Sequence, residues 1–163
     1  MTSSSTLPDS AQRVATLLQN LNHPHTVRML PATGKTSAEA AAGLGCDISA
    51  IAKSIIFKRL VDGAAVLVVA SGASRVDEAK VTALVGPIGK ADAKFVKERT
   101  GYAIGGVCPI GHAFEPVILL DQGLFALESL WAAAGHPHAV FNLTPQQLQA
   151  MTGAPVVDVS LQV

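Results

Sequence analysis

Two apolar runs decide the fold: residues 54–60 (SIIFKRL) and 64–70 (AAVLVVA), joined by Val61-Asp62-Gly63. Both runs are rich in branched aliphatic side chains, which favour strands over helices. An Asp-Gly step between two such runs is typical of a tight turn, because both residues tolerate the backbone angles that the turn requires. The segment therefore predicts an antiparallel β-hairpin.

The hairpin is surrounded by both helical and strand patterns. Ser10 is a candidate cap for the first helix, and Thr36-Ser37-Ala38-Glu39 has the form of a capping box, with Gly45 as the stop. Helices are expected over 11–22, 36–44, 76–84, 92–99 and 145–151, and further strands over 26–30, 117–120, 130–134, 139–143 and 156–159. These elements do not alternate regularly, which favours an α+β (mixed α/β) domain with a curved, largely antiparallel mixed sheet and helices around it.

Composition sets the protein class. The chain has 163 residues, 49% of them hydrophobic and 15% charged, so one domain with a full core can form. Twelve basic residues balance twelve acidic ones, which excludes a strongly basic nucleic-acid clamp but allows a local basic rim. We expect a polar, flexible leader over residues 1–10 and a single domain over 11–163.

Membrane, export and disulfide classes are disfavoured. The longest apolar run, 64–70, is far shorter than the roughly 20 residues that a spanning helix needs. Cys46 and Cys108 lie far apart and belong to no CxxC pair, which is usual for a chain in a reducing compartment. A cytoplasmic protein with no membrane association is expected.

Several short motifs do not satisfy the chemistry they suggest. Gly34-Lys35-Thr36 lacks the glycine that a phosphate-binding loop has five residues earlier, where Met29 stands. The His-Pro-His segments at 23–25 and 136–138 carry no carboxylate pattern, so no metal site is expected. Cys108 with His112 could form a nucleophile and base, or Cys108 could simply pack beneath a loop.

Two features remain open from the residues alone. Lys53 lies among apolar residues at the start of the first hairpin run, where it either extends to solvent or is directed into a pocket. Residues 100–111 (TGYAIGGVCPIG) contain four glycines and a proline, so this loop can present bare backbone amides to an oxyanion or a substrate. The alternative for the loop is a tight connection between a helix and a strand.

Together these segments resemble the YbaK family, the editing domains associated with prolyl-tRNA synthetase. The resemblance rests on residues 36–41 (TSAEAA), 52–57 (AKSIIF), Ser71-Gly72, Arg75-Val76-Asp77, residues 100–111 and the strand ending at Asp121. It implies a free-standing aminoacyl-tRNA deacylase with a pocket between Lys53 and a Gly-x-x-x-Pro loop at 105–109. No cofactor and no metal are implied.

The resemblance also implies residue roles. Lys53 would orient the ester, and the amides of Gly105 and Gly106 would hold the reacting carbonyl, with a water as nucleophile. The side chains expected around the substrate are Tyr102, Val107, Pro109, His112, Ala133 and Val140. His112 could instead face solvent.

The substrate expectation follows from a departure from the family pattern. Cysteinyl-tRNA deacylases of this type have a serine and an aspartate where this chain has Ala133 and Val140. An apolar pocket suits alanyl- or 2-aminobutyryl-tRNA(Pro) first, and cysteinyl- or seryl-tRNA next. The partners implied are the acceptor end of aminoacyl-tRNA and a prolyl-tRNA synthetase; the alternative is a non-catalytic aminoacyl- or nucleotide-binding module of the same fold.

A basic run is the remaining candidate for RNA contact. Lys80, Lys90, Lys94, Lys97 and Arg99 form the densest group of cations in the chain. It could be a patch for the acceptor end or simply a solvated helix face.

Overall fold

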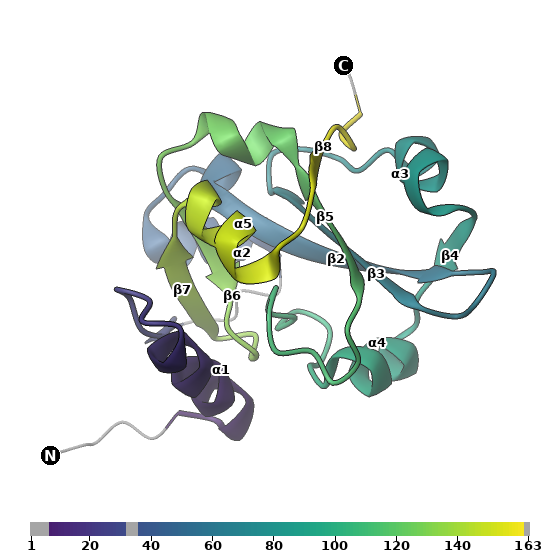
Figure 1. Ribbon diagram of the computed structural model, residues 1–163. Coiled ribbons are helices and arrows are strands. Elements are labelled where there is room, and N and C mark those ends of the chain that lie inside the picture. The colour runs from purple at the N-terminus through teal and green to yellow at the C-terminus, as the bar shows by residue number, and fades with distance from the viewer. Residues whose placement is uncertain (1–6, 32–35, 162–163) are drawn as a thin grey trace, which may run out of the picture.

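The computed structural model describes residues 7–31 and 36–161, and the hairpin lies at its centre (Figure 1). Strand β2 (Ile51–Arg59) pairs antiparallel with β3 (Ala65–Ser71), in register from Ala52 opposite Ser71 to Lys58 opposite Ala65. Every residue of β3 is buried, so this strand forms the middle of the sheet. The predicted hairpin is confirmed.

In the described ranges, eight strands form one mixed sheet in the order β1-β7-β6-β2-β3-β5-β8, with β4 paired to β2 beside that path. The other strands are β1 (Arg28–Met29), β4 (Ile88–Lys90), β5 (Val117–Asp121), β6 (Leu130–Ala133), β7 (Ala139–Leu143) and β8 (Val156–Val157). Among the described strands, four pairings are antiparallel and three parallel. The expected mixed α/β class is confirmed.

Five helices surround the sheet in the part of the chain that the structure describes, and side-chain caps define the start of most of them. They are α1 (Asp9–Asn20), α2 (Ser37–Leu44), α3 (Glu78–Val85), α4 (Ala93–Thr100) and α5 (Pro145–Thr152), with short 3₁₀ turns η1 (Ile48–Ala50) and η2 (Gln122–Ala126). The Thr36–Glu39 capping box forms as predicted, and Gly45 ends α2 with φ of 68°. No helix in the described ranges is long and apolar enough to cross a bilayer.

The first helix differs from its prediction. It begins at Asp9 with Pro8 before it, so Ser10 lies inside the helix instead of capping it. Of the leader expected over 1–10, residues 1–6 lie outside the described residues, and the last two belong to α1. The helix buries Ala11, Val14 and Leu18 in the largest core cluster.

A buried carboxylate joins the end of β5 to the C-terminal segment. Asp121 is fully buried, and its Oδ1 accepts from the Val159 amide at 3.0 Å. Its Oδ2 accepts from the Ser160 hydroxyl at 2.9 Å and the Gly123 amide at 3.1 Å. Three donors compensate the burial of this group, so the aspartate at the strand end is structural.

The sheet leaves part of one strand edge open. On the side of β2 away from β3, β6 pairs with Ile51 and Ala52, and β4 pairs with residues 57–59. None of the described strands therefore pairs with residues 53–56 on that side. This gap positions the candidate site, and it could not be anticipated because β4 was not predicted.

Candidate active site

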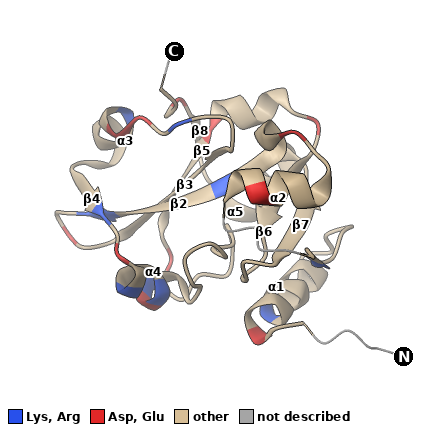
Figure 2. Ribbon diagram, turned by 180° about the vertical axis from the view of Figure 1, so that it is seen from behind, with Lys and Arg blue, Asp and Glu red and all other residues tan. Residues whose placement is uncertain are grey.

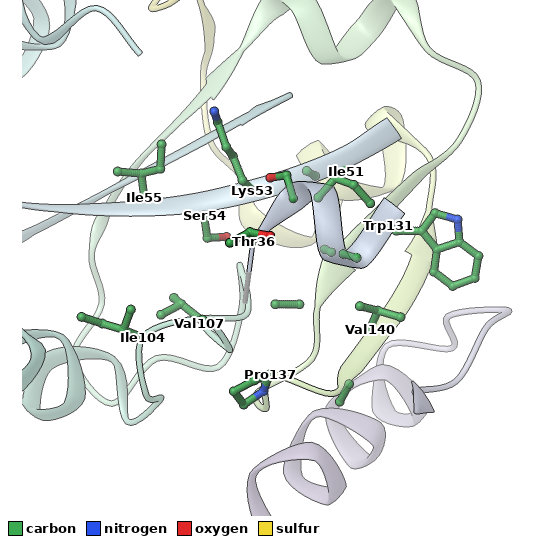
Figure 3. A pocket seen from close by; sticks show the side chains of 17 residues that line it. Thr36, Ile51, Lys53, Ser54, Ile55, Ile104, Val107, Trp131, Pro137 and Val140 are labelled. Carbon is green, nitrogen blue, oxygen red and sulfur yellow. The ribbon is translucent and has the colours of Figure 1, made fainter. Parts of the chain in front are cut away.

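A cavity of about 340 Å³ lies along the open edge of β2, within the size range of small-molecule sites (Figure 3). Its walls come from α2, β2, β6, β7 and the loop after α4. The lining residues are Thr36, Ser37, Ala40, Ile51, Ala52, Lys53, Ser54, Ile55, Ile104, Gly105, Val107, Trp131, Ala132, Ala133, Pro137, Ala139 and Val140. Of the residues expected at the site, Lys53, Gly105, Val107, Ala133 and Val140 are brought together here.

The wall opposite β2 is apolar. Ala133 of β6 and Val140 of β7 are directly opposed in the antiparallel pair, so they face the same side of the sheet. Val140 packs with Leu30, Ala40 and Ile51 in a small core cluster beneath α2. At Ala133 and Val140 this wall offers only methyl groups to a ligand, and Trp131 of β6 also lines the cavity.

Ser54 supplies an unpaired polar group at the cavity. Its Oγ is buried and has no hydrogen-bond partner among the described residues. Figure 3 shows this side chain on the same side of β2 as Val107. A buried hydroxyl without a partner is costly, which indicates that a ligand or a water completes it.

The main chain of Ser54 is free as well. The Gly72 amide donates to the Ile51 carbonyl at 2.7 Å, and the Arg59 amide donates to the Ala64 carbonyl at 2.8 Å. Odd-numbered residues of β2 therefore bond to β3, and the amide and carbonyl of Ser54 point to the open edge. Ser54 was not predicted as a site residue. Because side chains alternate along a strand, its side chain points to the face of the sheet opposite that of Lys53.

Lys53 leaves β2 on the other side. In Figure 3 its side chain points away from Val107 and Pro137, and its ammonium donates to the Ser74 carbonyl. Burial, reinforced by the nearby Arg75 guanidinium, lowers the pKa of the Lys53 ammonium. The lysine therefore lines the cavity with its stem, and its charged end is held at the β3–α3 turn.

The glycine loop closes the cavity from the side of α4. Gly105 has φ of 92°, a conformation that favours glycine. The Gly106 amide was expected to hold the reacting carbonyl. In the structure it donates instead to the Ala103 carbonyl at 3.0 Å, so it is not free to bind a substrate. A Cβ at Gly106 would lie 2.8 Å from the His136 backbone, which shows how closely the loop approaches the β6–β7 turn.

Comparison with known proteins identifies the family to which the chain belongs. The family described as "Aminoacyl-tRNA editing domain" matches residues 32–151. The chain belongs to this family. The predicted resemblance to YbaK-type editing domains is confirmed.

Solved structures and a curated relative resemble this editing domain over nearly its whole length. A crystal structure described as "a putative trans-editing enzyme for prolyl tRNA synthetase" is 40% identical with a TM-score of 0.89, covering 96% of this chain and 100% of that one. The hypothetical protein APE2540 is 31% identical with a TM-score of 0.84, covering 91% and 99%. The uncharacterized protein YwhH of Bacillus subtilis is 32% identical over 90% of this chain and 94% of its own length.

Beneath the loop of this editing domain, Tyr102 and Arg13 form a brace. Tyr102 is fully buried, and its hydroxyl donates to the Ile110 carbonyl at 2.8 Å. Arg13 of α1 donates to the Gly111 carbonyl at 2.8 Å and lies 4.7 Å from the centre of the Tyr102 ring. Tyr102 therefore supports the loop and does not line the cavity.

Cys108 and His112 face the core below the loop. Cys108 is fully buried, and burial raises the pKa of its thiol to about 12. His112 donates from Nε2 to the Cys108 carbonyl at 2.6 Å, and burial lowers the pKa of its imidazole. A buried, protonated thiol is a poor nucleophile, so the Cys108–His112 hydrolase alternative has no geometric support.

Pro109 and His112 were expected beside the substrate. Pro109 is buried, and neither residue lines the cavity.

Proposed function

We propose that this editing domain hydrolyses the ester bond of mischarged aminoacyl-tRNA, with alanyl- or 2-aminobutyryl-tRNA(Pro) as substrate. The observation that carries the proposal is the cavity, where an apolar wall at Ala133 and Val140 lies near unpaired polar groups at Ser54. The likeness to the solved structure described as "a putative trans-editing enzyme for prolyl tRNA synthetase" supports the choice of tRNA.

The reaction needs little machinery because an aminoacyl ester is already activated. A water oxygen attacks the carbonyl carbon, the bond from that carbon to the ribose oxygen breaks, and the ribose oxygen takes up a proton. The products are the free amino acid and tRNA with an intact 3′ end. The protein's part is to hold the ester and to stabilise the oxyanion of the tetrahedral intermediate.

Each group at the cavity has a role in this scheme. The Ser54 hydroxyl and carbonyl accept hydrogen bonds from the α-ammonium of the aminoacyl group. The Gly105 amide, which has no partner in the described part of the chain, donates to the reacting carbonyl. The Lys53 ammonium is bound to the Ser74 carbonyl on the other side of β2 from Ser54, so its role requires that it leave this carbonyl and turn toward the ribose or phosphate of the terminal nucleotide.

Selectivity follows from the apolar wall. Methyl groups at Ala133 and Val140 accommodate a small aliphatic side chain but leave a seryl hydroxyl without a partner. Each methylene changes binding in such a pocket by only about 1–3 kcal/mol, so alanine and 2-aminobutyrate are separated weakly. Both are therefore proposed as substrates, with a prolyl-tRNA synthetase as the enzyme whose errors are corrected.

Deacylation assays test the proposal. Purified protein is incubated with alanyl-, 2-aminobutyryl-, seryl- and cysteinyl-tRNA(Pro), beside a Lys53→Ala variant whose folding is checked by thermal melting. We expect the first two esters to be cleaved fastest, and cleavage to be lost in the variant. Binding of the charged tRNAs without cleavage of any would instead identify a non-catalytic binding module.

A further inference from the structure

Four residues between β2 and the glycine loop form a continuous series of cations and rings, which we call the cation–ring strip. Lys58 Nζ lies 5.6 Å from the centre of the Phe95 ring. The Arg99 guanidinium carbon lies 5.9 Å from the same ring and 5.2 Å from the Phe114 ring. The strip therefore joins β2, α4 and the end of the loop.

Two residues of the strip are exposed and two, Phe95 and Arg99, are half-buried, and no ion pair among the described residues neutralises its charges. Phe114 is 57% exposed, a high value for an aromatic side chain, and Lys58 is also exposed. None of the ion pairs seen among the described residues involves Lys58 or Arg99. Figure 2 shows further basic residues on α4 and at β4. The strip thus offers stacking surfaces and unpaired cations together.

The course of the chain keeps the strip near the cavity. Ile104 lines the cavity and is itself 54% exposed, so it forms part of the rim. Arg99 precedes Ile104 by five residues, which limits the distance between them to about 18 Å even for an extended chain. The Phe114 amide donates to the Arg99 carbonyl at 2.9 Å, which holds Phe114 next to Arg99.

We propose that the cation–ring strip binds the single-stranded 3′ end of tRNA next to the nucleotide whose amino acid occupies the cavity. This inference rests on the proposed function, since it takes an aminoacyl-tRNA as the substrate. Unpaired bases stack on aromatic rings and on guanidinium planes, and phosphates bind free cations. A chain with zero net charge needs such a local site, because it attracts RNA weakly as a whole.

The structure also separates Lys80 of the basic run from this strip. Lys80 of α3 donates to both Asp158 oxygens, at 3.1 and 3.0 Å, and to the Ser160 carbonyl at 2.7 Å. Its charge is therefore already used in the fold. Of the cations considered from the sequence, Arg99 belongs to the strip, and Lys58 is an addition that only the folded structure supplies.

Fluorescence anisotropy with two RNA hairpins that carry no amino acid tests whether the strip binds the 3′ end. Both carry the acceptor stem of tRNA(Pro); one retains the unpaired 3′ nucleotides and the other is blunt. We expect the wild type to bind the tailed hairpin more tightly, and Phe114→Leu to weaken that binding about tenfold without affecting the blunt hairpin. Arg99→Gln should lower the slope of log Kd against log salt by about 0.7 for the tailed RNA.

Two controls make the result decisive. Phe114→Trp keeps a ring and should retain tail binding, and Lys80→Gln removes a cation outside the strip and should leave it unchanged. An unaltered preference for the tailed hairpin in Phe114→Leu, or equal losses on both hairpins, would overturn the proposal. The hairpins carry no aminoacyl ester that could be hydrolysed, so the binding result is independent of whether the protein cleaves any ester.

Discussion

Replacing Gly106 by alanine should damage both the stability of the fold and the site. The new Cβ would lie 2.8 Å from backbone atoms of His136, and these atoms cannot move as a flexible side-chain end could. The loop and the β6–β7 turn must separate by about 0.6 Å to reach the 3.4 Å of an ordinary contact. Such overpacking costs about 1–3 kcal/mol, which corresponds to a Tm lower by about 3–9 °C.

The same displacement moves a wall of the cavity. Gly105 and Val107, on either side of Gly106, both line it. A misplacement approaching 1 Å in a catalytic site can reduce the rate by about a hundredfold, so we expect kcat/KM for alanyl-tRNA(Pro) to fall at least tenfold. Differential scanning calorimetry and a deacylation time course measure the two effects.

Gly43→Ala is the matched control. Gly43 lies in α2, where a Cβ would meet Leu30 Cδ2 at 3.5 Å, an ordinary contact. Alanine in a helix is more stable than glycine by about 0.5–1 kcal/mol, so this variant should melt about 1–3 °C higher. If Gly106→Ala melts at the wild-type temperature with full activity, the close packing of the loop against His136 is refuted.

Three further predictions concern single side chains. Ser54→Ala should leave Tm unchanged or higher, since its hydroxyl has no partner, yet raise KM for alanyl-tRNA(Pro); an unchanged KM would contradict its proposed role. Burial lowers the pKa of His112 in the folded state, so the unfolded chain takes up a proton at this residue at a higher pH than the folded chain. The free energy of unfolding should therefore fall as the pH drops below about 6.5. Urea titrations at several pH values should show a shallower fall for His112→Gln than for the wild type. Val140→Ala should raise the preference for 2-aminobutyryl- over alanyl-tRNA(Pro), measured by competing deacylation, and a preference that moves toward alanine would count against the wall.

Local signals made much of the fold predictable. The Asp62-Gly63 turn and the Thr36–Glu39 capping box depend on residues close in the chain, and both formed where expected. Strand β4 (Ile88–Lys90) was missed because three residues after a Gly-Pro break carry no periodicity. Its pairing with β2 is a tertiary contact, and the gap in the sheet depends on that contact.

The site was predictable only in part for the same reason. The family resemblance indicated Lys53 and the glycine loop, and both border the cavity. The unpaired Ser54 hydroxyl could not be anticipated, because its environment depends on where β6 and β4 stop pairing with β2. Tyr102 was expected at the substrate, but a glycine-rich loop has no periodicity that shows which side chains turn inward.

The brace between Arg13 and Gly111 extends the working unit beyond the family's own boundary. The family match covers residues 32–151, whereas Arg13 belongs to α1 (Asp9–Asn20). A protein shortened to residues 32–151 would therefore lack the Arg13 side chain that holds the Gly111 end of the glycine loop, although every residue of the loop itself would still be present.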